Sequence, residues 1–280
     1  MGVRLEPYLV GTINLKDGNR FDYPYRESIT AMAKVCDKVV VFVASNCTDG
    51  TNKVVYEMVK ENSKIWPVFA VKWEGKAEEI YYNFEKYFYS NICPTIWFDW
   101  GKANLWRLHL DSDEIIHESC YSKFREVIQN SEYDGYYIRR VNLFKKFNLC
   151  KKYGVNKLCG DDNIRLKFIP PTKEYVFVNP HMEGFPKTVK TTKKYIDELV
   201  VFHYSYMRYG NIIIDKAIDF QKEFLGYVDP GIEEMKRQGK YTPYHCGDSD
   251  LMPIPMPHPA IMSEYIKKHS FDPSRAIQAV

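Results

Sequence analysis

The strongest constraint on the fold is an alternation of apolar, strand-like segments with helix-like segments over residues 8–111. Residues 39–43 (Val-Val-Val-Phe-Val) are apolar on both faces, which is the pattern of an interior strand in a parallel sheet. Three more strand-like segments span residues 8–13, 68–71 and 105–111. Between the first two strands, apolar residues recur at helical spacing over residues 29–36. This alternation predicts a doubly wound, mostly parallel α/β sheet with right-handed crossovers.

The pattern changes after the strand that ends at Asp111. Residues 121–129 predict a helix, and residues 135–141 alternate in the way that predicts a strand. Further strands are expected at residues 164–169, 175–178 and 198–204, with helices from Asn211 onward. We therefore expect a Rossmann-like mixed α/β sheet, mostly parallel, followed by a helical C-terminal extension.

The strand at residues 105–111 stops on acidic residues, Asp111 and Asp113. In an open α/β sheet, ligands bind at the carboxyl ends of the strands. Two carboxylates there can hold a hard divalent cation through oxygen, and such a cation can bridge phosphate groups. Aspartate and serine are also common in turns and helix caps, so this short sequence alone leaves a purely structural turn open.

Composition narrows the class of protein. The 280 residues are 45% hydrophobic and 27% charged, which is ordinary for a globular protein, and the net charge of +3 does not demand a polyanionic partner. No apolar run approaches the ~20 residues of a membrane span, and the first residues lack the form of a signal peptide. The seven cysteines are widely spaced without a C-x-x-C pair, so we expect reduced thiols and a cytoplasmic location.

Several motifs taken in order resemble one enzyme family. The strand at residues 39–43, the turn Cys47-Thr48-Asp49-Gly50-Thr51 and the stretch Leu110-Asp111-Ser112-Asp113-Glu114 resemble the motifs of GT-A glycosyltransferases of family 2. In the second half, the similarity is to lipopolysaccharide-core-type members, at residues 134–144, 161–166 and 201–204. The resemblance covers residues 8–210.

The resemblance implies a fold, a domain organisation and an activity. The GT-A catalytic domain would span residues 1–210, with a nucleotide-sugar half (1–117), an acceptor half (118–210) and a helical extension over residues 211–280. The implied activity is metal-dependent, inverting transfer of a sugar from a nucleoside-diphosphate sugar to an acceptor hydroxyl, expected on a saccharide. Two alternatives stay open: transfer to a hydroxylated nucleic-acid base, and a non-catalytic nucleotide- or nucleic-acid-binding module of the same fold.

The resemblance also implies roles for individual residues. The metal, Mn²⁺ or Mg²⁺, would be bound by Asp111, Asp113 and His203, where it can neutralise a departing diphosphate. The nucleotide sugar would be contacted by Thr12, Asn14, Ser45, Asn46, Asp49, Asp111 and Arg208. The general base that deprotonates the acceptor hydroxyl would be Asp162 or its neighbour Asp161. If neither serves, Glu114 or Glu183 is the next candidate, independently of the resemblance.

The short segment of residues 44–46 departs from the family pattern. The family usually has one or two aspartates just after the second strand, where the base and ribose are read, and this chain has Ala44, Ser45 and Asn46 there. The departure leaves the identity of the nucleotide open. We expect base recognition to rely on backbone groups and on Ser45 or Asn46.

Overall fold

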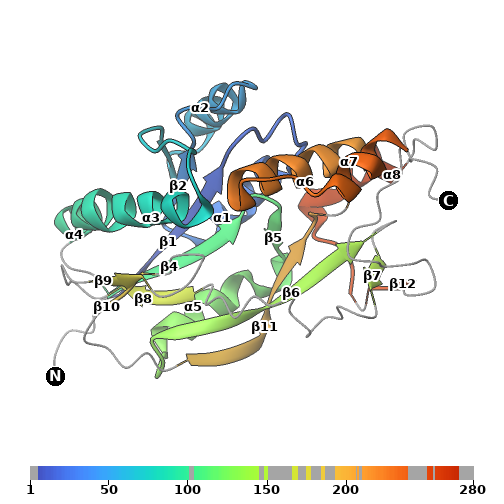
Figure 1. The fold of residues 1–280 in the computed structure, drawn as a ribbon. Coiled ribbons are helices and arrows are strands. Elements are labelled where there is room, and N and C mark those ends of the chain that lie inside the picture. The colour runs from blue at the N-terminus through green and yellow to red at the C-terminus, as the bar shows by residue number, and fades with distance from the viewer. Residues whose placement is uncertain are drawn as a thin grey trace, which may run out of the picture.

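The computed structural model shows an α/β fold with a mixed central sheet (Figure 1). It describes residues 6–100, 104–144, 148–150, 166–169, 175–177, 184–186, 193–205, 207, 210–238, 251–254 and 256–270. The predicted fold class, a Rossmann-like sheet with helical C-terminal segments, is confirmed, and it agrees with the GT-A-like architecture that the resemblance implies.

The first half of the sheet is parallel. Its strands are β1 (Pro7–Leu15), β2 (Lys38–Val43), β3 (Ile65–Val68) and β4 (Asn104–Asp111), in the order β3-β2-β1-β4. The helices between them are α1 (Tyr25–Val35), α2 (Thr51–Glu61), α3 (Ala77–Tyr87), the π-helix η1 (Phe88–Ile92) and α4 (Cys93–Trp100). The strand order reverses at β1, so the carboxyl ends of β1 and β4 form the switch point at which such sheets bind ligands.

The predicted bounds of the third strand are wrong. The strand is β3 at Ile65–Val68, and it pairs with β2 as the edge of the sheet. Pro67 lacks an N–H group, which an edge strand tolerates but which hides the strand from a search for apolar runs. Val71 is nevertheless buried, because the apolar run continues beyond the strand end and packs against α3 and η1.

The second half of the sheet is mixed. The short β5 (Glu114–Ile116), η2 (Glu118–Cys120) and α5 (Tyr121–Gln129) lead into β6 (Gly135–Phe144). The later strands are β7 (Asn148–Cys150), β8 (Leu166–Ile169), β9 (Tyr175–Phe177), β10 (Gly184–Pro186), β11 (Lys193–His203) and β12 (Leu251–Met252). Strand β8 lies antiparallel between β4 and β6, and β11 runs parallel to β6 and antiparallel to β5. This pairing brings the end of β11 to the turn that follows β4.

The described part of the C-terminal segment is mostly helical, as expected. Its described helices are α6 (Gly210–Leu225), α7 (Pro230–Arg237), η5 (Ala260–Met262) and α8 (Ser263–Ser270). Within the described ranges, none of the helices has both the length and the apolar character needed to span a bilayer.

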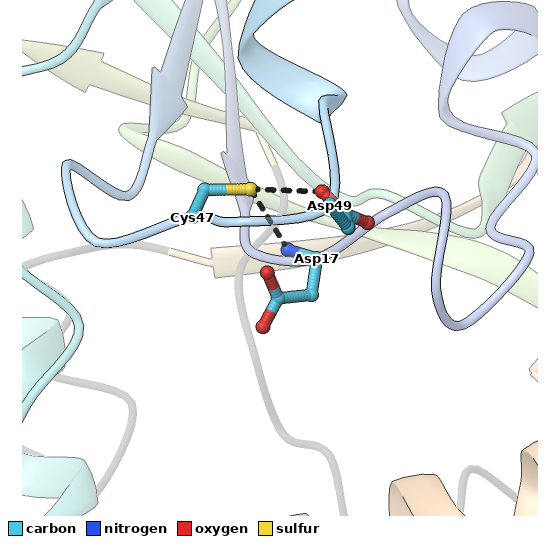
Figure 2. Close-up of side chains that lie close together, drawn as sticks. All are labelled: Asp17, Cys47 and Asp49. Atoms are coloured by element: carbon cyan, nitrogen blue, oxygen red, sulfur yellow. Dashed lines mark hydrogen bonds between the residues drawn. The ribbon is translucent and has the colours of Figure 1, made fainter.

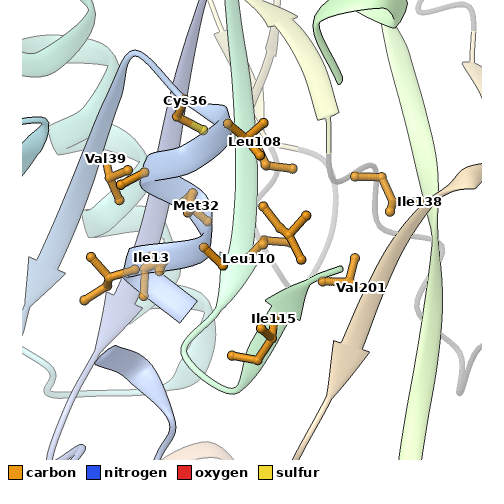
Figure 3. Packing of buried hydrophobic residues seen from close by; sticks show 14 of the residues in the cluster. Ile13, Met32, Cys36, Val39, Leu108, Leu110, Ile115, Ile138 and Val201 are labelled. Carbon is orange, nitrogen blue, oxygen red and sulfur yellow. The ribbon is translucent and has the colours of Figure 1, made fainter. Parts of the chain in front are cut away.

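Apolar side chains cover both faces of the sheet. Successive residues of β1 point to opposite faces. Leu9 and Ile13 belong to the cluster formed with α1 and α5, part of which Figure 3 shows, whereas Tyr8 and Val10 belong to the cluster formed with α3 and η1. The inner strands β1, β2 and β4 are therefore buried on both sides over most of their length.

A buried ion pair fastens α3 to the sheet below the strand ends. Arg107 on β4 is 1% exposed and donates to both carboxylate oxygens of Glu85 on α3, at 2.7 and 2.5 Å. Its Nε donates to Oγ1 of Thr12 at 2.8 Å, and the same oxygen lies 2.9 Å from Nδ1 of His109. The bidentate geometry offsets the loss of hydration of the two charges. This network fixes β1, β4 and α3 relative to one another just beneath the switch point.

Replacing Glu85 with alanine should destabilise the protein by about 3–5 kcal/mol, because Arg107 would stay buried without its carboxylate partner. Urea unfolding followed by circular dichroism measures this free energy. The double variant Glu85→Leu/Arg107→Met replaces the pair with apolar groups and should recover most of the loss. Equal stability of the wild type and Glu85→Ala would contradict the role given to the ion pair.

Candidate active site

The pairing of β1 with β4 places Asn14 directly beside Asp111 at the switch point. Oδ1 of Asn14 is buried and has no hydrogen-bond partner within the described residues. The side chain of Asp111 is 42% exposed, with Nη2 of Arg140 3.9 Å from one carboxylate oxygen. A buried acceptor that lacks a donor costs free energy unless a ligand or a water satisfies it. This edge therefore places an accessible carboxylate next to a buried amide oxygen that lacks a hydrogen-bond donor.

The carboxylate of Asp113 lies in the turn between β4 and β5 and is almost completely buried. The last residue of β11, His203, places Nε2 3.5 Å from Oδ1 of Asp113. Lys216 on α6 places Nζ 3.3 Å from Oδ2. The N–H of Tyr204 donates to the backbone oxygen of Asp113 at 2.9 Å, next to the paired residues of β11 and β5. The fold thus brings together two of the three predicted metal ligands from distant parts of the sequence.

The surroundings of His203 keep its imidazole neutral at pH 7. Burial lowers the pKa of His203 to about 4, and the guanidinium of Arg140 acts in the same direction. Nδ1 lies 2.9 Å from Oδ1 of Asn142, a contact that suits the tautomer with the proton on Nδ1. The lone pair is then on Nε2, which faces Asp113. Metal-binding histidines have this arrangement, with the second ring nitrogen held by a neighbouring acceptor.

The chemistry of these side chains fits a divalent cation. Carboxylate oxygens suit Mg²⁺ and Mn²⁺, and a neutral imidazole can complete the ligand set. A lone-pair nitrogen beside a carboxylate oxygen needs positive charge close by, and in this structure the ammonium group of Lys216, 3.3 Å from Oδ2 of Asp113, supplies it. Asp111 lies farther out and does not form a tight group with Asp113 and His203. Within the described residues, the three potential ligands whose donor atoms all lie within 4.8 Å of one another are Asp17, Cys47 and Asp49. Asp111 would join Asp113 and His203 on one cation only if its side chain turned inward.

Glu114 holds the acidic turn in place. Its carboxylate accepts the N–H of Asp111 at 2.9 Å and lies 2.8 Å from Nε of Arg140 on β6. Its backbone oxygen accepts the hydroxyl of Ser28 on α1 at 2.8 Å. These contacts show that Glu114 stabilises the acidic turn. Its predicted role as an alternative general base is untested and stays a prediction.

The turn after β2 is tied to the loop after β3. The N–H of Ser45 donates to the carbonyl of Val71 at 2.9 Å, and the Ser45 side chain is exposed. The side chain of Asn46 donates to the carbonyl of Trp73 at 2.9 Å and accepts from its N–H at 3.0 Å. The amide of Asn46 therefore aligns the two loops, and Ser45 remains open to a ligand.

Asp49 holds both the start of α2 and the loop after β1. Its Oδ1 accepts the N–H and the hydroxyl of Thr51 at 3.0 and 2.6 Å, and Oδ2 accepts the N–H of Arg20 at 2.7 Å. Sγ of Cys47 donates to Asp49 at 3.1 Å and accepts the N–H of Asp17 at 3.3 Å (Figure 2). Burial raises the pKa of Asp49, but these hydrogen bonds outweigh it, so that the pKa is lowered. The carboxylate of Asp49 therefore links the turn after β2 to the loop after β1.

The other predicted residues lie below this edge or outside the described ranges. Thr12 is fully buried, with its hydroxyl engaged by Arg107 and His109. Outside the described residues are Asp161, Asp162, Glu183 and Arg208, whose roles stay predictions.

Sequence reasoning gave no role to three side chains that contact the acidic turn or His203. Arg140 and Asn142 lie two residues apart on β6 and so share one face, a signal that the alternation contains. Lys216 lies in an amphipathic helix, and no motif marks it.

Helix α8 fastens the loop that follows β1. Nζ of Lys268 and Nε2 of His269 lie 2.8 and 3.0 Å from the carboxylate oxygens of Asp22. The hydroxyl of Tyr265 donates to the Asp22 backbone oxygen at 3.1 Å. Burial raises the pKa of Asp22, but the hydrogen bonds and charges of His269 and Lys268 outweigh it and bring the pKa down to about 2. The C-terminal helix thus stabilises a loop of the switch point.

Comparison with known proteins gives weak similarities. No protein-family model and no curated protein matches the chain. A crystal structure of S. aureus TarS 1-349 is 10% identical, with 82% of this chain and 69% of that chain covered and a TM-score of 0.40. The same fragment in complex with UDP is 15% identical, with 49% and 36% covered and a TM-score of 0.34. The same fragment in complex with UDP-GlcNAc is 15% identical, with 49% of this chain and 35% of that chain covered and a TM-score of 0.33.

The chain spans 22% of the length of a further S. aureus TarS structure, at 14% identity and a TM-score of 0.32. Similarity of this degree identifies neither a family nor an activity for this chain.

The contact between α8 and Asp22 predicts a loss of stability in acid. A carboxyl group whose pKa falls on folding stabilises the protein above its unfolded pKa, here 3.8, and loses this effect as the pH falls through the folded value near 2. Between pH 4 and pH 2, the wild type should lose about 1–2 kcal/mol more stability than Asp22→Asn. Urea unfolding at a series of pH values measures the difference, and parallel pH curves for the two proteins would contradict it.

Proposed function

We propose that this chain is a metal-dependent, inverting glycosyltransferase of the GT-A family 2 type, which acts from a nucleoside-diphosphate sugar on an acceptor hydroxyl. The supporting observation is the group of side chains at the ends of β4 and β11, where Asp113 faces the neutral imidazole of His203 and Asp111 lies at the rim. The order of the motifs at residues 47–51 and 110–114 supports the same class of enzyme.

The donor would bind at the switch point of the sheet. Its diphosphate would lie near Asp111 and Asp113, and its nucleoside would lie toward the turn after β2. Because the amide of Asn46 already pairs with Trp73, base recognition would fall to backbone groups and to Ser45. Oδ1 of Asn14 could accept a hydrogen bond from a donor hydroxyl. Arg208 would bind a phosphate oxygen in bidentate fashion.

The cation would be held by Asp111, Asp113 and His203. When bound, Mn²⁺ or Mg²⁺ would neutralise charge on the diphosphate as a Lewis acid. Asn142 fixes the His203 ring so that Nε2 points at Asp113, and Glu114 orders the turn that carries both aspartates. These supporting contacts would keep Asp113 and His203 in place before the donor arrives, and the side chain of Asp111 would turn inward to join them.

Transfer would be a single displacement. The acceptor oxygen would attack the anomeric carbon while the bond from that carbon to the diphosphate oxygen breaks, which inverts the configuration. The proton of the acceptor hydroxyl would pass to a carboxylate, and the resemblance favours Asp162 or Asp161 for this role. We take the acceptor to be a saccharide.

A second candidate function is a nucleotide-binding module without turnover. The observation that favours it lies in the turn after β2, where Ala44 is buried and the amide of Asn46 is already engaged. Few side chains then remain to read the base. Such a module would bind a nucleotide but would need no carboxylate base, so turnover measurements separate the two functions.

A screen of nucleoside-diphosphate sugars for thermal stabilisation, with and without Mn²⁺, tests the donor site directly. A rise in Tm that needs both Mn²⁺ and a nucleotide sugar would support the proposal. The absence of any shift with every nucleotide and nucleotide sugar, at ligand concentrations of several millimolar and with or without Mn²⁺, would refute the donor site.

Replacing Asp113 with alanine should reduce transfer to background while the far-ultraviolet circular dichroism stays that of the wild type, because the predicted cation loses its most buried ligand. Excess EDTA should have the same effect on the wild type, and added Mn²⁺ should reverse it. Asp197→Ala, at an exposed aspartate of β11, is the matched control. Full transfer in excess EDTA would rule out the metal.

Replacing the general base should lower kcat by roughly 10²–10⁴-fold, the usual contribution of a positioned base. We expect this loss for Asp162→Asn, or for Asp161→Asn if the neighbour takes the role. The dissociation constant of the donor should hardly change, because the base contacts the acceptor. Steady-state kinetics and donor titration of each single variant provide the measurement. If both variants keep near wild-type turnover, the base is another residue.

A further inference from the structure

One face of α6 lies along the loops at the strand ends. Lys216, Asp219 and Glu223 follow one another at helical spacing and so project from the same side of the helix. Figure 1 shows α6, in orange, passing the ends of β1 and β4. Each of the three side chains contacts a loop of the switch point, so the helix is attached where the proposed donor would bind.

Two of these contacts anchor α6 to loops that follow β1 and β3. The carboxylate of Asp219 lies 2.7 Å from Nη1 of Arg20. Glu223 accepts from Nε1 of Trp73 at 2.9 Å and pairs with Lys16. None of these contacts involves a predicted metal ligand, so they can persist whatever happens at Asp113.

The third contact is made by Lys216 and differs from the others. Its Nζ lies 3.3 Å from Oδ2 of Asp113, donates to Oγ of Ser205 at 2.7 Å and lies 5.0 Å from the centre of the Tyr23 ring. The side chain of Asp113 is 3% exposed, whereas that of Lys216 is 27% exposed. A buried carboxylate needs a compensating positive charge, and the ammonium group supplies one.

We propose that Lys216 and a divalent cation are alternative partners of Asp113, so that binding of the cation displaces Lys216 and releases the contact between α6 and the acidic turn. This inference rests on the metal site of the proposed function. An ammonium group and a divalent cation repel each other strongly when both lie within about 4 Å of one buried carboxylate. The flexible stem of lysine lets the ammonium group swing outward, whereas the carboxylate of Asp113 is held by its turn.

Displacement gives Lys216 a second task. Once it leaves Asp113, its charge remains at the carboxyl edge of the sheet, beside the place where the diphosphate of a donor would lie. The chain would then keep Asp113 neutralised in both states, first by lysine and then by the cation. Binding of the cation would require the contact between Lys216 and Asp113 to break, which lowers the affinity for the cation. Because Lys216 is carried by α6, the position of this helix would partly set that affinity.

Direct Mn²⁺ titration tests the proposal without any substrate. The signal of free Mn²⁺ in electron paramagnetic resonance gives the dissociation constant for the full chain at fixed pH and ionic strength. Lys216→Met keeps the length of the side chain but removes the charge, and it should bind Mn²⁺ roughly tenfold more tightly, within the usual range of coupling between two sites. Lys216→Gln is a second variant with the same expectation, in case the first folds poorly.

Lys222→Met is the matched control, because Lys222 is an exposed lysine of the same helix. This variant changes the net charge equally and should leave the affinity for Mn²⁺ within twofold of that of the wild type. Asp113→Asn should remove the binding that Lys216→Met strengthens, which identifies the site.

Three results would overturn the inference: equal Mn²⁺ affinity for the wild type and both Lys216 variants, the same gain in Lys222→Met, or no Mn²⁺ binding that depends on Asp113. The first two leave the proposed function untouched, because the donor screen and turnover test it separately. Conversely, tighter Mn²⁺ binding by the Lys216 variants together with a failed donor screen would support the inference and refute the transferase.

Discussion

The arrangement at the strand ends depends on positive charges that compensate the carboxylates buried by the sheet topology. Asp113 lies in the turn after β4 and Glu114 begins β5, and they are 2% and 1% exposed. An uncompensated carboxylate at such depth costs several kcal/mol. Glu114 lies beside Arg140 from β6, and Asp113 lies beside Lys216 from α6. The acidic turn is therefore stable only when parts of the chain from far along the sequence have packed around it.

An irregularity in β11 sets the identity of the side chain that faces Asp113. Up to Ile196 the strand pairs with β6 in one register, and from Val200 it continues in another, so that His203 stands opposite Asn142. If the first register continued without the shift, Val200 would stand opposite Asn142 in place of His203. Because a change of register exchanges the residues at each position of a sheet, this local shift delivers an imidazole to Asp113 in place of an isopropyl group. Site chemistry here depends on strand pairing as much as on motif.

The sequence predicts those features whose signal is local. The apolar run at residues 39–43 and the helix at Tyr121–Gln129 have periodic patterns, and both form as expected. Strand β3 was misplaced because Pro67 interrupts its pattern. Strand β11 begins at Lys193, five residues before the strand expected at residues 198–204, because its first residues are mostly polar and carry no apolar run. The strand-end position of Asn46 was predictable, but its pairing with Trp73 was not, since that pairing depends on how two loops meet.

The same reasoning explains why the C-terminal helices escape a motif search and still belong to the site. Lys216, Asp219 and Glu223 share one helix, so their contacts with Asp113, Arg20 and Trp73 are positioned by a single rigid element. A shift of α6 would change the electrostatic environment of Asp113 and the position of the loops after β1 and β3 together. In the proposed transferase, the acidic turn would hold the cation, and the loops after β1 and β3 would line the nucleotide pocket. A helix without any recognisable motif would then couple the two halves of donor binding, through charges whose spacing along the helix is their only sequence signature.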